Sequence, residues 1–180
     1  MSLAARGALL EAHENYQKQS FRNRCYILGS GGPEMLQVPV VHGDSRLITD
    51  IEVDYSTPWV VRTQRALDTA YETSAFYEYY RDGVFALLDA KPRTLWELNL
   101  STIRFLLEKT GFPFKLSETA DYVPSAPEDY RNIIHPKKAS PFPERPHYQV
   151  FRDKLGGFTP GLSALDLLFN EGPGSIEWLL

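Results

Sequence analysis

The sequence predicts a mixed α/β fold, because its hydrophobic pattern changes period along the chain. Apolar and polar residues alternate over residues 47–55, which is typical of a strand with one buried face. From residue 59 onward, apolar residues recur at steps of three and four, which is typical of helices. Seven of the thirteen prolines then fall within residues 113–147. We therefore expect a small sheet in the N-terminal third, helices packed on it, and a loop-rich C-terminal wrap ending in a short helix.

Length and composition favour one globular domain spanning residues 1–180. The chain is 43% apolar and 23% charged, and its net charge of −4 argues against a general nucleic-acid binder, which must neutralise phosphates. No segment approaches the roughly 18 apolar residues of a membrane span, and nothing resembles a signal peptide. The single cysteine, Cys25, excludes an intramolecular disulfide and fits a reducing compartment. We expect a cytoplasmic protein.

The N-terminal third predicts several short strands. Residues 7–12 are expected to form the tail of a strand or helix, and residues 21–28 and 35–41 to form two strands joined by the Gly-rich run 29–33. That run lacks the Lys-Ser/Thr ending of a phosphate-binding loop, so a hairpin turn is the better interpretation. Residues 47–55 are the clearest strand by alternation.

The first helices follow the last of these strands. Thr57 is a good N-cap, with Pro58 at the first helical position. Apolar residues then continue at helical spacing through residues 76–87. The aromatic residues of this region could form a stacking platform, but at this spacing they are more often core.

Capping signals mark two further helices. Thr94 and Glu97 form a capping box at the start of one helix, and Gly111 closes it. Ser163 caps a short final helix, and Asp166 is expected to be a charge in its first turn rather than a catalytic acid.

Two polar stretches are candidate ligand sites. Residues 13–25 read HENYQKQSFRNRC, and residues 129–138 read DYRNIIHPKK within the Pro-rich loop 113–147, so cations and amides are dense in both. Such groups can grip a phosphate or carboxylate, with arginine acting as a bidentate fork. The two stretches could face each other across one site. The candidate ligand-binding residues are His13, Lys18, Gln19, Arg22, Asn23, Arg24, Arg131, His135 and Lys137.

No catalytic constellation is assigned. The histidines (His13, His42, His135 and His147) are scattered without metal-ligand spacing, so we predict no metal. Any cofactor is left unassigned by the sequence. Cys25 is more simply a buried structural residue than a nucleophile, since Arg24 would point the opposite way on a strand. The alternative for residues 13–25 is an edge strand kept soluble by its charges.

Four segments together resemble the WbqC-like family of bacteria. They are residues 13–25, the Trp59…AYETSAFYEYY region (59–80), residues 129–138, and YQVF…GFTPGLSALDLLFNEGP (148–173). The resemblance covers nearly the whole chain and implies an association with genes for O-antigen and other surface polysaccharides. It also implies transfer of a small acyl or aminoacyl group to an amino sugar.

The chain departs from the family pattern in three places. The resemblance implies that a strand–helix unit with which family members normally start would precede Met1, and the sheet edge left without it would make a homodimer possible. Thr63 stands four residues after Trp59, where the family often has histidine, and Gly161 stands where asparagine is usual.

Two hypotheses follow for function. The first is a transferase that holds an anionic or nucleotide-sugar ligand with the cations of residues 18–24 and 131–138. The second is a non-catalytic binding or scaffold protein of the same pathway. In the first case the cations line an open pocket with unpaired donors; in the second, Glu14, Asp129 or Asp166 neutralise them in buried ion pairs.

Overall fold

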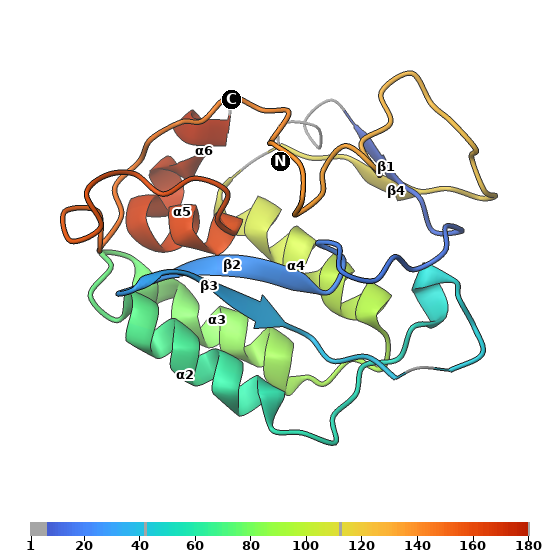
Figure 1. The fold of residues 1–180 in the computed structure, drawn as a ribbon, viewed down its shortest axis with the longest axis horizontal. Helices are drawn as coiled ribbons and strands as arrows, with labels where there is room; N and C mark the ends of the chain where they lie inside the picture. The colour runs from blue at the N-terminus through green and yellow to red at the C-terminus, as the bar shows by residue number, and fades with distance from the viewer. Residues whose placement is uncertain (1–6, 42, 112, 180) are drawn as a thin grey trace.

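The computed structural model describes residues 7–41, 43–111 and 113–179, and it confirms a mixed α/β fold. Figure 1 shows a β-hairpin lying against a group of helices, with a separate pair of short strands at one end. Within the described ranges, no helix is long and apolar enough to cross a bilayer.

The hairpin consists of β2 (Arg24–Gly29) and β3 (Gly32–Gln37). The two strands are antiparallel, and Gly29 pairs with Gly32, so the predicted hairpin at the Gly-rich run is confirmed. Gly32 has a φ of +117°, which favours glycine at this position. The outer edge of β2 is covered, because Tyr26 O accepts a hydrogen bond from Ser163 N at 2.7 Å.

The strand predicted over residues 47–55 is wrong. A short 3-10 helix, η1 (Ile48–Asp50), occupies its start, and only single bridges follow, from Val53 to Val40 and from Glu52 to Thr94. Ile51 and Val53 are nevertheless buried, at 7% and 6% exposure. The alternation therefore predicted correctly which side chains are buried. It did not predict a strand, because each bridge pairs this segment with a different part of the chain and no continuous ladder forms.

Three helices pack behind the hairpin: α2 (Trp59–Tyr71), α3 (Tyr77–Asp89) and α4 (Leu95–Lys109). Pro58, not Thr57, is the N-cap of α2, and no side chain caps it, so that prediction was wrong by one residue. The Thr94–Glu97 capping box of α4 is confirmed, with Glu97 N donating to Thr94 Oγ1 at 3.2 Å. Gly111 follows α4 with a φ of +64°, as expected of a helix-ending glycine.

The C-terminal part contains α5 (Ala164–Glu171), η2 (Gly172–Gly174) and α6 (Ser175–Leu179). Ser163 caps α5 as predicted, because its hydroxyl accepts from Leu165 N at 3.3 Å. Asp166 lies in the first turn of α5 as expected, and its side chain is buried, at 1% exposure. Its hydrogen bonds are described with the site below.

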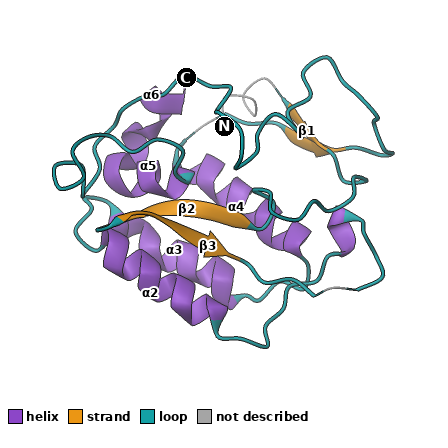
Figure 2. Ribbon diagram, in the orientation of Figure 1, coloured by secondary structure: helices purple, strands orange, loops and turns teal. Residues whose placement is uncertain are grey.

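The remaining strands, β1 (Ala8–Leu10) and β4 (Leu116–Glu118), form a parallel pair. The tail of a strand expected at residues 7–12 is thus confirmed, and β4 adds a short strand inside the predicted loop segment. Between β4 and α5 the described chain contains no helix or strand, and Figure 2 shows it as a continuous loop. This loop wraps back across the hairpin (Figure 1).

Two clusters make up most of the core. The first joins Ile27 of β2 to buried residues of α2, α3 and α5, among them Leu67, Tyr77 and Phe169. The second gathers η1, Trp59 and the first turn of α4, including Leu98. The start of β2 lies where the two clusters meet, and a cavity opens there.

Candidate functional site

A cavity of about 190 Å³ lies between the start of β2 and the helices α2, α3 and α4. Its lining is mostly apolar, with Leu67, Leu98 and Phe105 among the side chains. Its polar lining residues include residues 22–24 at the start of β2, Thr63 of α2, and Asn99 and Thr102 of α4. A cavity of roughly 150 Å³ with apolar walls can hold a molecule the size of benzene, so this one has room for a small ligand.

Asn23 is one of the residues that line this cavity, and its side chain includes a buried acceptor without a partner in the described part of the chain. The residue is 4% exposed, and its Nδ2 donates to Val38 O at 2.9 Å. Because a carbonyl can be met only by the NH₂ end of the amide, this bond fixes the side-chain orientation. Oδ1 is buried and has no hydrogen-bond partner among the described residues.

Arg24 and Trp59 also line this cavity, and each has a buried donor. Arg24 Nε and Trp59 Nε1 are both buried, and neither donates to any acceptor in the described part of the chain. The Trp59 ring stacks on Tyr55 with centroids 5.7 Å apart, which holds the indole in place. A buried unpaired polar group costs about 1–3 kcal/mol. Three such atoms belong to residues that line this one cavity.

Arg22 differs from Arg24 in having a carboxylate partner. Its Nε and Nη2 donate to the two carboxylate oxygens of Glu14 at 2.8 and 2.7 Å, and both side chains are only 14% exposed. Its backbone carbonyl accepts from Asn99 Nδ2 at 2.7 Å. Arg22 thus ties the polar stretch to α4, and its charge is compensated.

Arg131 is likewise paired. Its guanidinium donates to both carboxylate oxygens of Asp129, to Val123 O at 2.7 Å and to Glu11 Oε2 at 3.3 Å. The Arg131 guanidinium lowers the pKa of Asp129 to about 2. Desolvation alone would raise the pKa of Glu11, but hydrogen bonds from Val123, His13 and Thr119 lower it overall.

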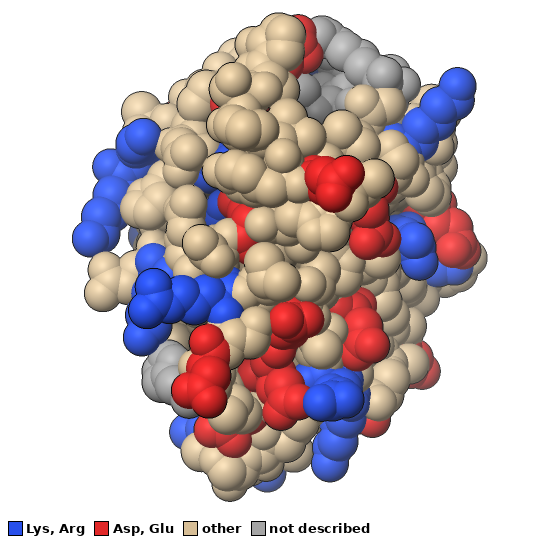
Figure 3. Space-filling view, turned by 90° about the vertical axis from the view of Figure 1, so that its right-hand side faces the viewer, with Lys and Arg blue, Asp and Glu red and all other residues tan. Residues whose placement is uncertain are grey.

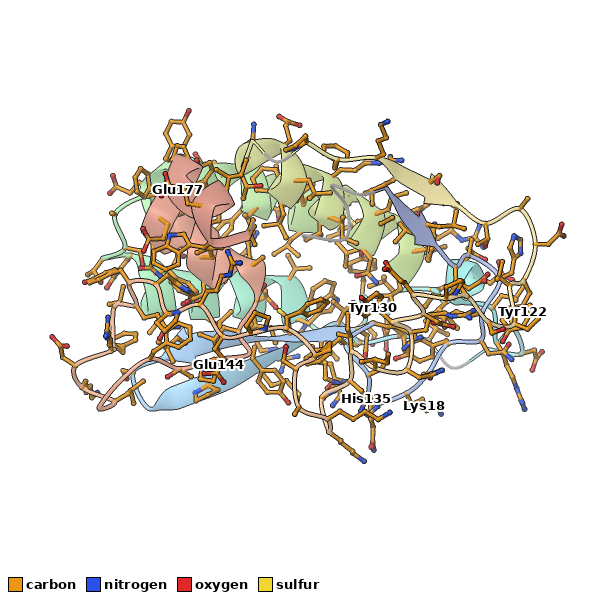
Figure 4. All side chains as sticks on the ribbon, turned by 90° about the horizontal axis from the view of Figure 1, so that it is seen from above. Lys18, Tyr122, Tyr130, His135, Glu144 and Glu177 are labelled. Carbon is orange, nitrogen blue, oxygen red and sulfur yellow. The ribbon has the colours of Figure 1, made fainter. Side chains whose placement is uncertain are left out.

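The two predicted polar stretches do meet, on the surface rather than in the cavity under β2. His13 and Arg131 line one surface hollow of about 410 Å³, and Lys137 Nζ donates to Gln19 Oε1 at 3.3 Å. Lys18 is exposed, and Figure 4 shows it projecting on the same side of the molecule as His135. The predicted residues are thus divided: Arg22, Asn23 and Arg24 line the cavity, and the others lie on the adjoining surface.

Charges of both signs are interspersed on the face shown in Figure 3, and carboxylates are prominent there. In residues 7–41, 43–111 and 113–179, no three His, Cys, Asp or Glu side chains come together as a metal site would require. His42 lies outside the described residues.

Cys25 lies in the wall between the cavity and a second surface hollow beneath residues 134–142. Desolvation raises the pKa of its thiol to about 11, although a hydrogen bond with Ser163 opposes the shift. A thiol with this pKa is protonated at neutral pH and is a poor nucleophile. The geometry agrees with a structural cysteine.

A buried polar network was missed from the sequence. The Asp166 carboxylate accepts hydrogen bonds from Tyr71 Oη at 2.9 Å, Gln149 Nε2 at 3.0 Å and His147 Nε2 at 2.7 Å. Tyr71 Oη in turn accepts from Leu28 N at 3.1 Å. The network joins α2, β2 and α5 to the C-terminal wrap, and none of its members lines the cavity. Its role in the described structure is to hold the wrap on the core.

Residues 4–140 match the sequence model of the WbqC-like protein family. The chain belongs to this family. A protein of Mycobacterium tuberculosis (strain ATCC 25618 / H37Rv), the uncharacterized protein Rv1507c, is 25% identical over 193 residues, which cover 91% of this chain and 83% of the relative. No solved structure matches this WbqC-like chain significantly.

Two cavity residues, Asn99 and Phe105, were not predicted as part of a site. They lie on the buried face of α4, where the sequence pattern signals only core packing. Thr63, which departs from the family pattern, also lines the cavity one helical turn beyond Trp59. The only sequence signal that this face of α2 lines a cavity was the position four residues after Trp59, where the family often has histidine and this chain has Thr63.

Proposed function

We propose that this WbqC-like protein is a cytoplasmic transferase of surface-polysaccharide biosynthesis, and that it binds a small acyl or aminoacyl group in the cavity under β2. The observation that carries the proposal is the set of three buried, unpaired polar atoms on residues of one mostly apolar cavity: Asn23 Oδ1, Arg24 Nε and Trp59 Nε1.

The chemistry of these atoms defines the ligand. Arg24 Nε and Trp59 Nε1 are donors, and the positive charge of Arg24 favours a carboxylate or a polarised carbonyl oxygen. Asn23 Oδ1 is an acceptor and requires an amino or hydroxyl group on the ligand. The apolar walls suit a hydrocarbon body. An amino acid, a hydroxy acid or the matching acyl group has all three parts.

A nucleotide sugar exceeds this cavity, since pockets for ligands of that size measure about 300–1,000 Å³. If the donor is a nucleotide sugar, its nucleotide lies on the adjoining surface with Lys18, Gln19, His135 and Lys137. Those side chains are exposed or partly exposed, and they supply cationic and amide donors.

A second function, a non-catalytic scaffold, is favoured by a different observation. Arg22 and Arg131 are neutralised by Glu14 and by Asp129 with Glu11, as structural cations would be. Arg24 favours the transferase over the scaffold, because no carboxylate pairs with it in the described ranges.

A thermal-shift screen tests the proposal, with amino acids, hydroxy acids, acyl-CoA, nucleotide sugars and phosphate at low salt. We expect small amino or hydroxy acids to raise the melting temperature of the wild type and of Arg65→Met, which removes an exposed cation of α2. Arg24→Met and Trp59→Phe should lose this shift. If no compound stabilises the wild type, the scaffold function takes its place.

A further inference from the structure

Phe105 of α4 is one of the side chains that line the cavity, together with Leu67, Val84 and Leu165. Trp59 packs with Leu98 in the second core cluster, whereas Phe105 packs against the first. Phe105 lies seven residues beyond Leu98 on the same helix, which corresponds to about 10 Å along its axis. Leu98, Asn99, Thr102 and Phe105 all line the cavity, so it follows α4 from its polar end to Phe105.

The position of the Phe105 ring depends on Gly83 of α3. A Cβ atom at Gly83 would lie 2.6 Å from Phe105 Cε2 and 2.9 Å from Cζ, distances that no side chain could occupy without moving the ring. Gly83 is a helix-interior residue, where glycine is otherwise unfavourable. The absence of a side chain there lets the Phe105 ring lie against the backbone of α3.

We infer that Phe105, seated on Gly83, limits the length of the hydrocarbon tail that the cavity accepts, and so restricts it to short-chain acyl or aminoacyl groups. This inference rests on the proposed function, because it takes the polar group of the ligand to bind at Asn23, Arg24 and Trp59. With that end fixed, a longer tail along α4 must meet the Phe105 ring.

Two substitutions move the limit in opposite directions. Phe105→Leu replaces the aromatic ring in the cavity wall with a smaller side chain, so a tail longer by two methylene groups should bind about tenfold more tightly than it does to the wild type. Gly83→Ala displaces the ring, and we expect it to weaken binding of the longest acid that the wild type accepts. Phe85→Leu is the matched control, because Phe85 packs against the same cluster but does not line the cavity.

The test is a calorimetric titration of the folded variants with straight-chain amino acids of increasing length: alanine, 2-aminobutyrate, norvaline and norleucine. The expected result is a preference for the shorter acids in wild type and Phe85→Leu, and a shift toward norleucine in Phe105→Leu. If one of the two variants, Phe105→Leu or Gly83→Ala, fails to fold, the length preference of the other is sufficient to test the inference. If the wild type binds the acids and neither substitution changes the length preference, this inference is overturned. If the wild type binds none of them, the proposed function fails instead.

Discussion

Two arginines separated by one residue have different surroundings on the polar stretch. Arg22 forms a bidentate ion pair with Glu14, whereas Arg24 makes one side-chain hydrogen bond within the described ranges, from Nη1 to Met35 Sδ at 3.9 Å. On an alternating strand such neighbours lie on the same face, so strand geometry alone does not distinguish them. The distinction comes from residue 14, which lies in irregular chain.

The Arg22–Glu14 pair leads to the first prediction. Glu14→Gln removes the negative charge and leaves the mostly buried Arg22 uncompensated, so the free energy of unfolding should fall by about 2 kcal/mol. Glu52→Gln is the control, since its partner Arg93 is 81% exposed and exposed pairs contribute little. Urea unfolding of both variants measures the difference. Equal effects would contradict the structural role assigned to Glu14.

Cys25 gives a second prediction at this scale. With its thiol pKa at about 11, the native protein holds roughly 100-fold less thiolate at neutral pH than an ordinary cysteine. Alkylation by iodoacetamide, followed by mass spectrometry, should therefore be at least about 100-fold slower in the native than in the urea-unfolded chain. Comparable rates would show that the thiol is exposed or activated, and would reopen a nucleophilic role.

Elements were predictable where a local signal decides them. The Thr94–Glu97 capping box and the Gly-rich hairpin turn depend on residues within a few positions of each other, and both are confirmed. The strand over residues 47–55 was wrong because a ladder depends on partners elsewhere, and here Val53 and Glu52 bridge to different segments. Burial can be predicted from alternation, but pairing cannot.

The junction between α5 and η2 gives a third prediction. Gly172 has a φ of +56°, and a Cβ there would lie 2.5 Å from Phe76 Cδ1, just before α3. Gly172→Ala combines backbone strain with a steric clash, so we expect a loss of about 2–4 kcal/mol in unfolding free energy. Gly174→Ala is the control, because a Cβ there meets no atom within 4 Å. Thermal unfolding with no difference between the two would contradict the close contact.

At the scale of the whole molecule, Arg131 attaches the long loop to the N-terminal strand region. It joins Asp129 and Val123 of the loop to Glu11, which follows β1. The sequence indicated that the two polar stretches could face each other across one site. It could not predict that Arg131 would pair with Glu11, since that contact joins residues more than a hundred positions apart.

This attachment leads to the fourth prediction. Arg131→Met should release the loop, and limited proteolysis at neutral pH should then cut it faster than in wild type or in Lys138→Met, which removes an exposed cation of the same loop. Protection at the same level in all three proteins would contradict this role.

Acid should loosen the same contact. The folded pKa of Asp129 is about 2, below its ordinary value near 4, so its stabilising contribution is complete above pH ~4 and is lost as the pH falls through 2. The protection of the Val123 amide, which donates to Glu11, should therefore fall over this range, measured as its exchange rate relative to that of an unstructured amide at the same pH. Asp129→Asn should exchange faster already at pH ~4.

The central claim is that the cavity under β2 holds a small ligand, and the indole N–H signals test it most directly. The chain has three tryptophans, Trp59, Trp96 and Trp178, and only Trp59 lines the cavity. Titration of the ¹⁵N-labelled protein with alanine or 2-aminobutyrate should move the Trp59 indole signal, identified by its loss in Trp59→Phe, and leave the other two in place. If the Trp59 signal stays fixed at saturating acid, or if only Trp96 and Trp178 respond, the cavity is not the binding site.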